Sequence, residues 1–165
     1  MKHRYAIPAI LCAVMLSAWA QSKAAGVLSA ADLKTVVPAS FFYRGQSASV
    51  QLRNAGGVRT ESGKYVLAGL VDTAGYASDI AQKYQGFFIS EVKVKVGGSE
   101  LNPGEYGFGF VGNKLVVTDV GANEVISATV NNDANLKRPV PLKIAPDGNA
   151  YRLYAGRKYV TLELE

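Results

Sequence analysis

The stretch "EYGFGFVGNKLVVTD", residues 105–119, contains the strongest fold signal in this sequence. Its first half alternates aromatic residues with glycine, so Tyr106, Phe108 and Phe110 fall on one face of a strand and the two glycines on the other. Gly-Asn follows and suits the tight turn of a hairpin, and an apolar run comes after it. We therefore predict an antiparallel hairpin with its aromatic face turned inward.

Two interpretations of the aromatic face stay open. Tyr106, Phe108 and Phe110 are either core residues or the lining of a cavity for a small, partly apolar ligand. Glycine weakens a strand unless the backbone has to bend or another group comes close. Closing a sheet into a barrel requires strong coiling, so the glycines favour a barrel.

The rest of the chain reads as short strands separated by turns rich in Gly, Asn and Asp. Short connections favour pairing between neighbours in sequence. We predict one all-β domain over residues 21–165, an antiparallel meander barrel of about eight or nine strands with one or two short helices, and a two-sheet β-sandwich as the alternative. The helices are expected at 29–38, capped by Ser29, and at 78–86, capped by Ser78.

The first twenty residues have the pattern of a cleavable signal peptide. A basic start precedes a short apolar run, and Ala18 and Ala20 supply small residues at the spacing of a cleavage site. We expect cleavage after Ala20, export to the periplasm or the extracellular space of a bacterium, and no transmembrane segment in the mature chain.

Removal of this segment also removes the single His, Cys and Trp of the sequence. Without His and Cys, the mature chain lacks the residues of a Ser-His-Asp or Cys-His nucleophile pair and of an ordinary zinc site. No spacing selects a catalytic pair of carboxylates, so we expect neither an enzyme nor a metal or other cofactor. The net charge falls from +5 to +3 because Lys2 and Arg4 leave, and we expect no nucleic-acid partner.

The C-terminal stretch "AYRLYAGRKYVTLELE", residues 150–165, predicts a hairpin that turns at Ala155-Gly156. In that register Tyr151 faces Val160, and the outer face carries two crossed pairs, Arg152 with Tyr159 and Tyr154 with Arg157. These four residues either stabilise the hairpin by themselves or form a patch for an anionic glycan, a lipid headgroup or a protein partner.

Taken together, these features predict an exported, non-catalytic binding protein. Its ligand is expected to be a small, partly apolar molecule or a component of the cell envelope. The alternative is a structural or protein-interaction module of the bacterial envelope, which would need no small ligand. A cavity of ligand size separates the two hypotheses.

Overall fold

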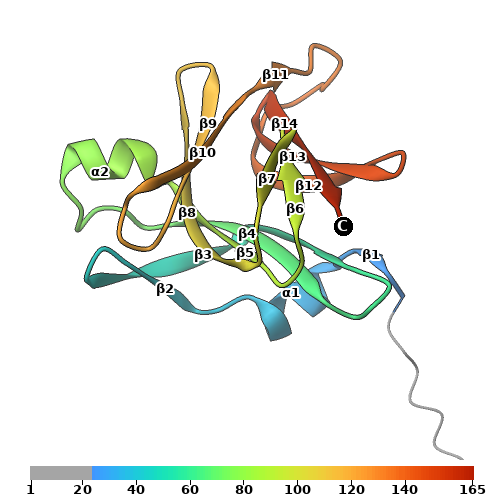
Figure 1. Ribbon diagram of the computed structural model, residues 1–165, viewed down its shortest axis with the longest axis horizontal. Coiled ribbons are helices and arrows are strands. Elements are labelled where there is room, and N and C mark those ends of the chain that lie inside the picture. The colour runs from blue at the N-terminus through green and yellow to red at the C-terminus, as the bar shows by residue number, and fades with distance from the viewer. Residues whose placement is uncertain (1–23) are drawn as a thin grey trace, which may run out of the picture.

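The computed structural model describes residues 24–165, and the predicted signal peptide lies outside the described residues. The described chain is mostly β-structure, arranged as two antiparallel sheets (Figure 1). None of its helices is long and apolar enough to cross a membrane.

The larger sheet has eight strands. Seven of them follow the order β1 (Gly26–Val27), β3 (Gln46–Arg59), β4 (Tyr65–Val71), β5 (Gly86–Ser90), β8 (Gly104–Val111), β9 (Lys114–Thr118) and β10 (Glu124–Thr129), and β2 (Ser40–Tyr43) pairs with β3. The smaller sheet has six strands. Its order is β12 (Val140–Asp147), β13 (Ala150–Gly156), β14 (Lys158–Leu164), β6 (Val94–Val96) and β7 (Ser99–Leu101), and β11 (Asn131–Asn132) pairs with β14.

The meander barrel is not confirmed, because neither sheet closes on itself in the part of the chain that the structure describes. The chain leaves the large sheet after β5, forms the β6–β7 hairpin in the small sheet, and returns as β8 beside β5. This crossing breaks the simple neighbour pairing on which the barrel prediction rested. The all-β prediction is confirmed, and the arrangement fits the two-sheet alternative.

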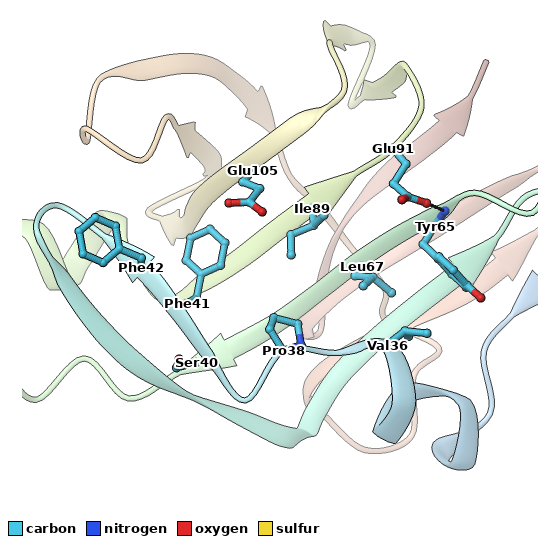
Figure 2. A pocket seen from close by; sticks show the side chains of 10 residues that line it. All are labelled: Val36, Pro38, Ser40, Phe41, Phe42, Tyr65, Leu67, Ile89, Glu91 and Glu105. Carbon is cyan, nitrogen blue, oxygen red and sulfur yellow. Dashed lines mark hydrogen bonds between the residues drawn. The ribbon is translucent and has the colours of Figure 1, made fainter.

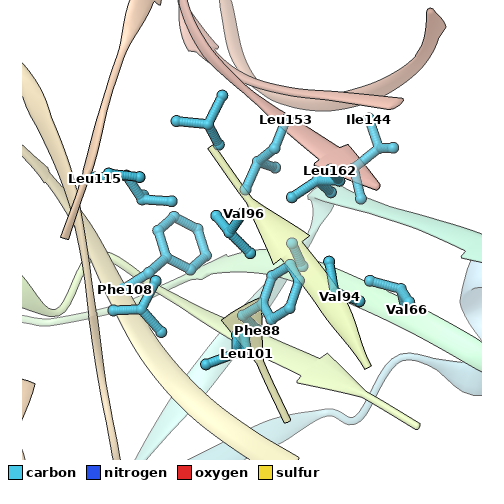
Figure 3. Packing of buried hydrophobic residues seen from close by; sticks show 14 of the residues in the cluster. Val66, Phe88, Val94, Val96, Leu101, Phe108, Leu115, Ile144, Leu153 and Leu162 are labelled. Carbon is cyan, nitrogen blue, oxygen red and sulfur yellow. The ribbon is translucent and has the colours of Figure 1, made fainter. Parts of the chain in front are cut away.

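The main core lies between the two sheets (Figure 3). Phe108 of β8 is fully buried there, opposite Val117 of β9, and Tyr106 and Phe110 are half-buried against the same cluster. The small sheet adds an apolar face that includes Val94, Val96, Leu101, Ile144, Leu153 and Leu162. The predicted 105–119 hairpin is therefore present with its aromatic residues turned inward.

A second apolar cluster covers the opposite face of the large sheet. It contains Phe41, Tyr43, Ala48, Leu67, Val71, Tyr84 and Phe87. It is built from the sheet itself, β2 and the segment that carries α2 (Ser78–Lys83), and Figure 1 shows β2 and α1 (Ala30–Val36) beneath the large sheet. The central strands are thus buried on both faces.

The glycines of β8 allow this second layer to come close. A Cβ atom on Gly107 would lie 2.5 Å from a ring carbon of Tyr43, and one on Gly109 would lie 2.7 Å from the carbonyl group of Lys83 in α2. Cβ atoms do not come this close to other heavy atoms, so any larger residue would push the layer away. Close packing, and not barrel coiling, explains these glycines.

The two predicted helices are present. Ser29 caps α1 with a capping box, because its hydroxyl accepts from the Asp32 N–H while the Asp32 carboxylate accepts from the Ser29 N–H. The cap predicted for α2 is wrong by one position. Ala77 occupies the N-cap without a side-chain hydrogen bond, and Ser78 is the first helical residue.

The register of the last hairpin differs from the prediction by two residues. Tyr151 faces Leu162, Leu153 faces Val160, and the turn is Gly156-Arg157. Gly156 has φ 67° while Arg157 has no positive φ, which is typical of a type II′ turn with glycine first. A shift of two keeps the strand residues on their predicted faces, but it moves Arg157 into the turn.

Candidate functional site

A groove lies between β2 and the outer face of the large sheet (Figure 2). We call it the β2 groove, and its volume is about 320 Å³. Leu67 and Ile89 form its floor, and the walls come from β2 and from the segment that connects α1 to β2. The lining residues are Val36, Pro38, Ser40, Phe41, Phe42, Tyr65, Leu67, Ile89, Glu91 and Glu105.

Strand register builds the floor. Leu67 of β4 faces Ile89 of β5, and Ile89 faces Glu105 of β8, so the three side chains form one row across three strands. This row lies on the same side of the sheet as the second apolar cluster. Its last member is a carboxylate, so the apolar floor ends at a charged group.

Two adjacent phenylalanines of β2 have opposite roles at the wall. Phe41 is buried and stacks on Phe87, with 5.5 Å between the ring centroids. Phe42 also borders the groove, but it is 62% exposed. The Phe42 ring therefore offers apolar surface at the edge of the groove.

The two carboxylates of the groove differ in their partners. Glu91 accepts a hydrogen bond from the Tyr65 main-chain N–H at 2.7 Å, and its own N–H donates to the Tyr65 carbonyl at 2.9 Å. Glu105 is exposed, and its carboxylate has no hydrogen bond or ion pair with any described residue. The Glu91 carboxylate therefore stabilises the local backbone, and the Glu105 carboxylate is unpaired within the described part of the chain.

Three tyrosines close the second cluster beyond the groove. The rings of Tyr43 and Tyr84 stack with centroids 3.9 Å apart, and Tyr76 packs edge-on against both. The Tyr43 hydroxyl shares a 2.6 Å hydrogen bond with the Thr118 hydroxyl, and the Tyr76 hydroxyl donates to the carbonyls of Tyr43 and Gln46. The Tyr84 hydroxyl is buried without a hydrogen-bond partner among the described residues. Burial raises the pKa of both Tyr43 and Tyr84.

The aromatic residues predicted to bind a ligand lie on the other face of β8 from the groove. Tyr106, Phe108 and Phe110 pack into or against the main core, and other residues line the β2 groove. The Tyr106 hydroxyl donates to the Asn102 carbonyl at 2.9 Å, and the rings of Phe108 and Phe110 meet edge to face. The structure brings these three together as packing partners, and their role in ligand binding stays a prediction.

The four residues of the predicted surface patch have partners within the chain. Arg152 lies 4.5 Å above the Tyr159 ring, as expected, and its guanidinium pairs with Asp147 at 2.7 Å. The Tyr154 hydroxyl donates to Asp133 at 2.8 Å. Arg157 does not pair with Tyr154.

Arg157 sits in the turn, because of the register shift, and there it donates to the Leu136 and Lys137 carbonyls. Its hydrogen bonds, together with the one between Tyr154 and Asp133, attach the loop before β12 to the last hairpin. These contacts therefore stabilise the fold without an external partner.

Sequence reasoning missed the floor and wall of the groove. Neither β2 nor β5 is among the predicted strands, because "FF" occurs in both where clean alternation is expected. The available signal was Phe41-Phe42 directly after a helix that ends near Pro38, since an aromatic pair in a short strand places one ring on each face. The described residues contain no group of three His, Cys, Asp or Glu side chains that could hold a metal ion.

Substitution of Tyr84 by Phe is expected to leave stability at pH 7 unchanged within about 1 kcal/mol, or to raise it, because the buried hydroxyl lacks a partner. Tyr43→Phe is the matched control. It should cost about 0.5–1.5 kcal/mol, since it removes the hydrogen bond to Thr118. Urea unfolding measures both, and a larger loss for Tyr84→Phe than for Tyr43→Phe would contradict this account.

The same variant has a pH signature. The pKa of Tyr84 is raised in the folded state, so above about pH 10, where an unperturbed tyrosine ionises, the unfolded chain has lost the proton that the folded chain keeps. Stability is therefore full below that pH and falls as pH rises. Tyr84→Phe should lose less stability than the wild type between pH 10 and 11, and an equal loss would refute the assignment.

A comparison with known protein families, curated proteins and solved structures finds no match for this chain. The geometry of the β2 groove is therefore the basis on which a function is proposed.

Proposed function

We propose that this chain is an exported, non-catalytic binding protein that holds a small, partly apolar molecule in the β2 groove. The observation that carries the proposal is the exposed Phe42 ring beside an apolar floor of Leu67 and Ile89. A ligand that covers Phe42 and fills the groove would remove apolar surface from water, at about 25 cal/mol for each Å².

The size and the lining of the groove support a small ligand. Pockets for small molecules have volumes of about 300 Å³ and more, are lined mainly by apolar and aromatic groups, and contain a few polar groups that orient the ligand. The β2 groove has a volume of about 320 Å³, with Ser40, Glu91 and Glu105 as its polar lining. No described nucleophile with an adjacent base lines it, so binding and not catalysis is the activity that we propose.

The alternative is an envelope-interaction module that binds through Arg152, Tyr154, Arg157 and Tyr159. Each of these side chains already contacts a group of the same chain. A partner would have to replace those contacts, whereas a ligand of the β2 groove would cover a surface that the chain leaves open. This difference is why we place the ligand in the groove.

Export is the second part of the proposal, and it depends on the pattern of residues 1–20. Expression of the full gene in a bacterial host should yield protein outside the cytoplasm that begins at Gln21 and carries no lipid. Intact mass spectrometry of the periplasmic and culture fractions measures this. A retained N-terminus or an added lipid mass would refute it.

The groove should bind a neutral apolar probe, and 4-phenyl-1-butanol measured by isothermal titration calorimetry serves as that probe. Phe42→Ala should weaken binding by about five- to tenfold, since burial of a phenyl face contributes about 1–1.4 kcal/mol. The control is Val125→Ala, which removes an exposed apolar side chain of β10 at the far edge of the sheet. Equal affinities of the Phe42→Ala and Val125→Ala variants for the probe would contradict the proposal.

A further inference from the structure

We propose that the ligand of the β2 groove carries a positive charge, an ammonium or a guanidinium group, that pairs with Glu105. This inference rests on the proposed function and names the class of ligand: an apolar body with one cationic end. The observations that carry it are the position of Glu105 at the end of the floor, its lack of a partner, and the absence of cations among the residues that line the groove.

Glu105 differs from two carboxylates at the small sheet. There, Glu100 pairs with Lys93 at 2.8 Å and Glu165 pairs with Lys95 at 2.9 Å. Glu105 has no such partner among the described residues, although it faces the apolar Ile89 across the strand pair. A carboxylate next to an apolar surface and without a counter-charge is the group that a cationic ligand would complete.

Glu91 adds a second negative charge beside the same floor residue. It lies two positions beyond Ile89, so Ile89 has one carboxylate across the strand pair and one along the chain. Its hydrogen bond with the Tyr65 N–H fixes the carboxylate at the groove. Nearby charges of one sign favour a ligand of the other sign.

None of the described residues that line the groove is Lys or Arg. The chain as a whole is basic, with a formal net charge of +5 that becomes +3 without Lys2 and Arg4. Overall attraction would therefore favour an anion, and only local charge favours a cation. The net charge of the protein and the local charge of the groove thus favour ligands of opposite sign. The sign of the ligand's charge therefore tests whether the groove determines binding.

The walls suit the apolar part of such a ligand. Phe41, Phe42 and Tyr65 present aromatic rings, and a cation is attracted to an aromatic face as well as to a carboxylate. Figure 2 shows Glu105 on the same side of the groove as the two phenylalanine rings. An aryl or alkyl body can thus lie on Leu67 and Ile89 while its charged end reaches Glu105.

The test uses three matched probes: 4-phenylbutylamine, 4-phenyl-1-butanol and 4-phenylbutyrate, titrated at pH 7 and low salt into the full chain. The amine should bind at least about tenfold more tightly than the alcohol, which corresponds to one hydrogen-bonded charge pair, and the butyrate should bind more weakly than the alcohol. Glu105→Gln should bring the amine to within about threefold of the alcohol, while the affinity for the alcohol stays the same. Glu124→Gln, an exposed glutamate of β10, is the control and should keep the wild-type preference.

The outcomes separate this inference from the proposed function. Equal binding of the amine and the alcohol, or tightest binding of the butyrate, overturns the inference and leaves the proposed function intact. A preference for the amine that survives Glu105→Gln overturns the assignment of Glu105. If none of the three probes binds, the proposed function itself fails.

Discussion

The structure depends on one constraint: the central strands of the large sheet are buried on both faces. In β5, Gly86, Phe87, Phe88 and Ser90 are all buried, so side chains that point in opposite directions both need an apolar neighbour. The small sheet covers one face and builds the main core. The other face needs a second layer, which β2, α1 and the α2 segment supply.

The candidate site follows from the limits of that second layer. Tyr84 and Tyr43 press directly on Gly107, and Gly109 meets the backbone of α2, so one end of the outer face is fully covered. Toward the other end the layer leaves the β2 groove, whose floor consists of the buried Leu67 and the half-buried Ile89. The second layer thus borders a groove with an apolar floor, and the Glu105 carboxylate, which pairs with no residue that the structure describes, lies at the end of that floor.

The sequence predicted the elements whose signals are local. The capping box of α1 and the Gly-Asn turn of the 105–119 hairpin depend on neighbouring residues, and both are present. It did not predict β5, because a strand buried on both faces has no alternation to detect. Nor did it predict how the chain crosses between sheets, since that is decided by contacts far apart in sequence. The glycines of β8 were noticed, but the groups that come close to them belong to other segments, so their role required the structure.

The most direct test of a second layer packed closely on β8 is the stability of Gly109→Ala, compared with Gly75→Ala by urea unfolding. The new methyl group at position 109 would lie 2.7 Å from the Lys83 carbonyl, and at position 75 it would meet only the Gln46 side chain at 3.5 Å. We predict a loss of about 1–3 kcal/mol for Gly109→Ala, because overpacking forces α2 to move. For Gly75→Ala we predict no loss, or a gain of up to about 1 kcal/mol from the stiffer unfolded chain. Equal stabilities of the two variants would contradict the account.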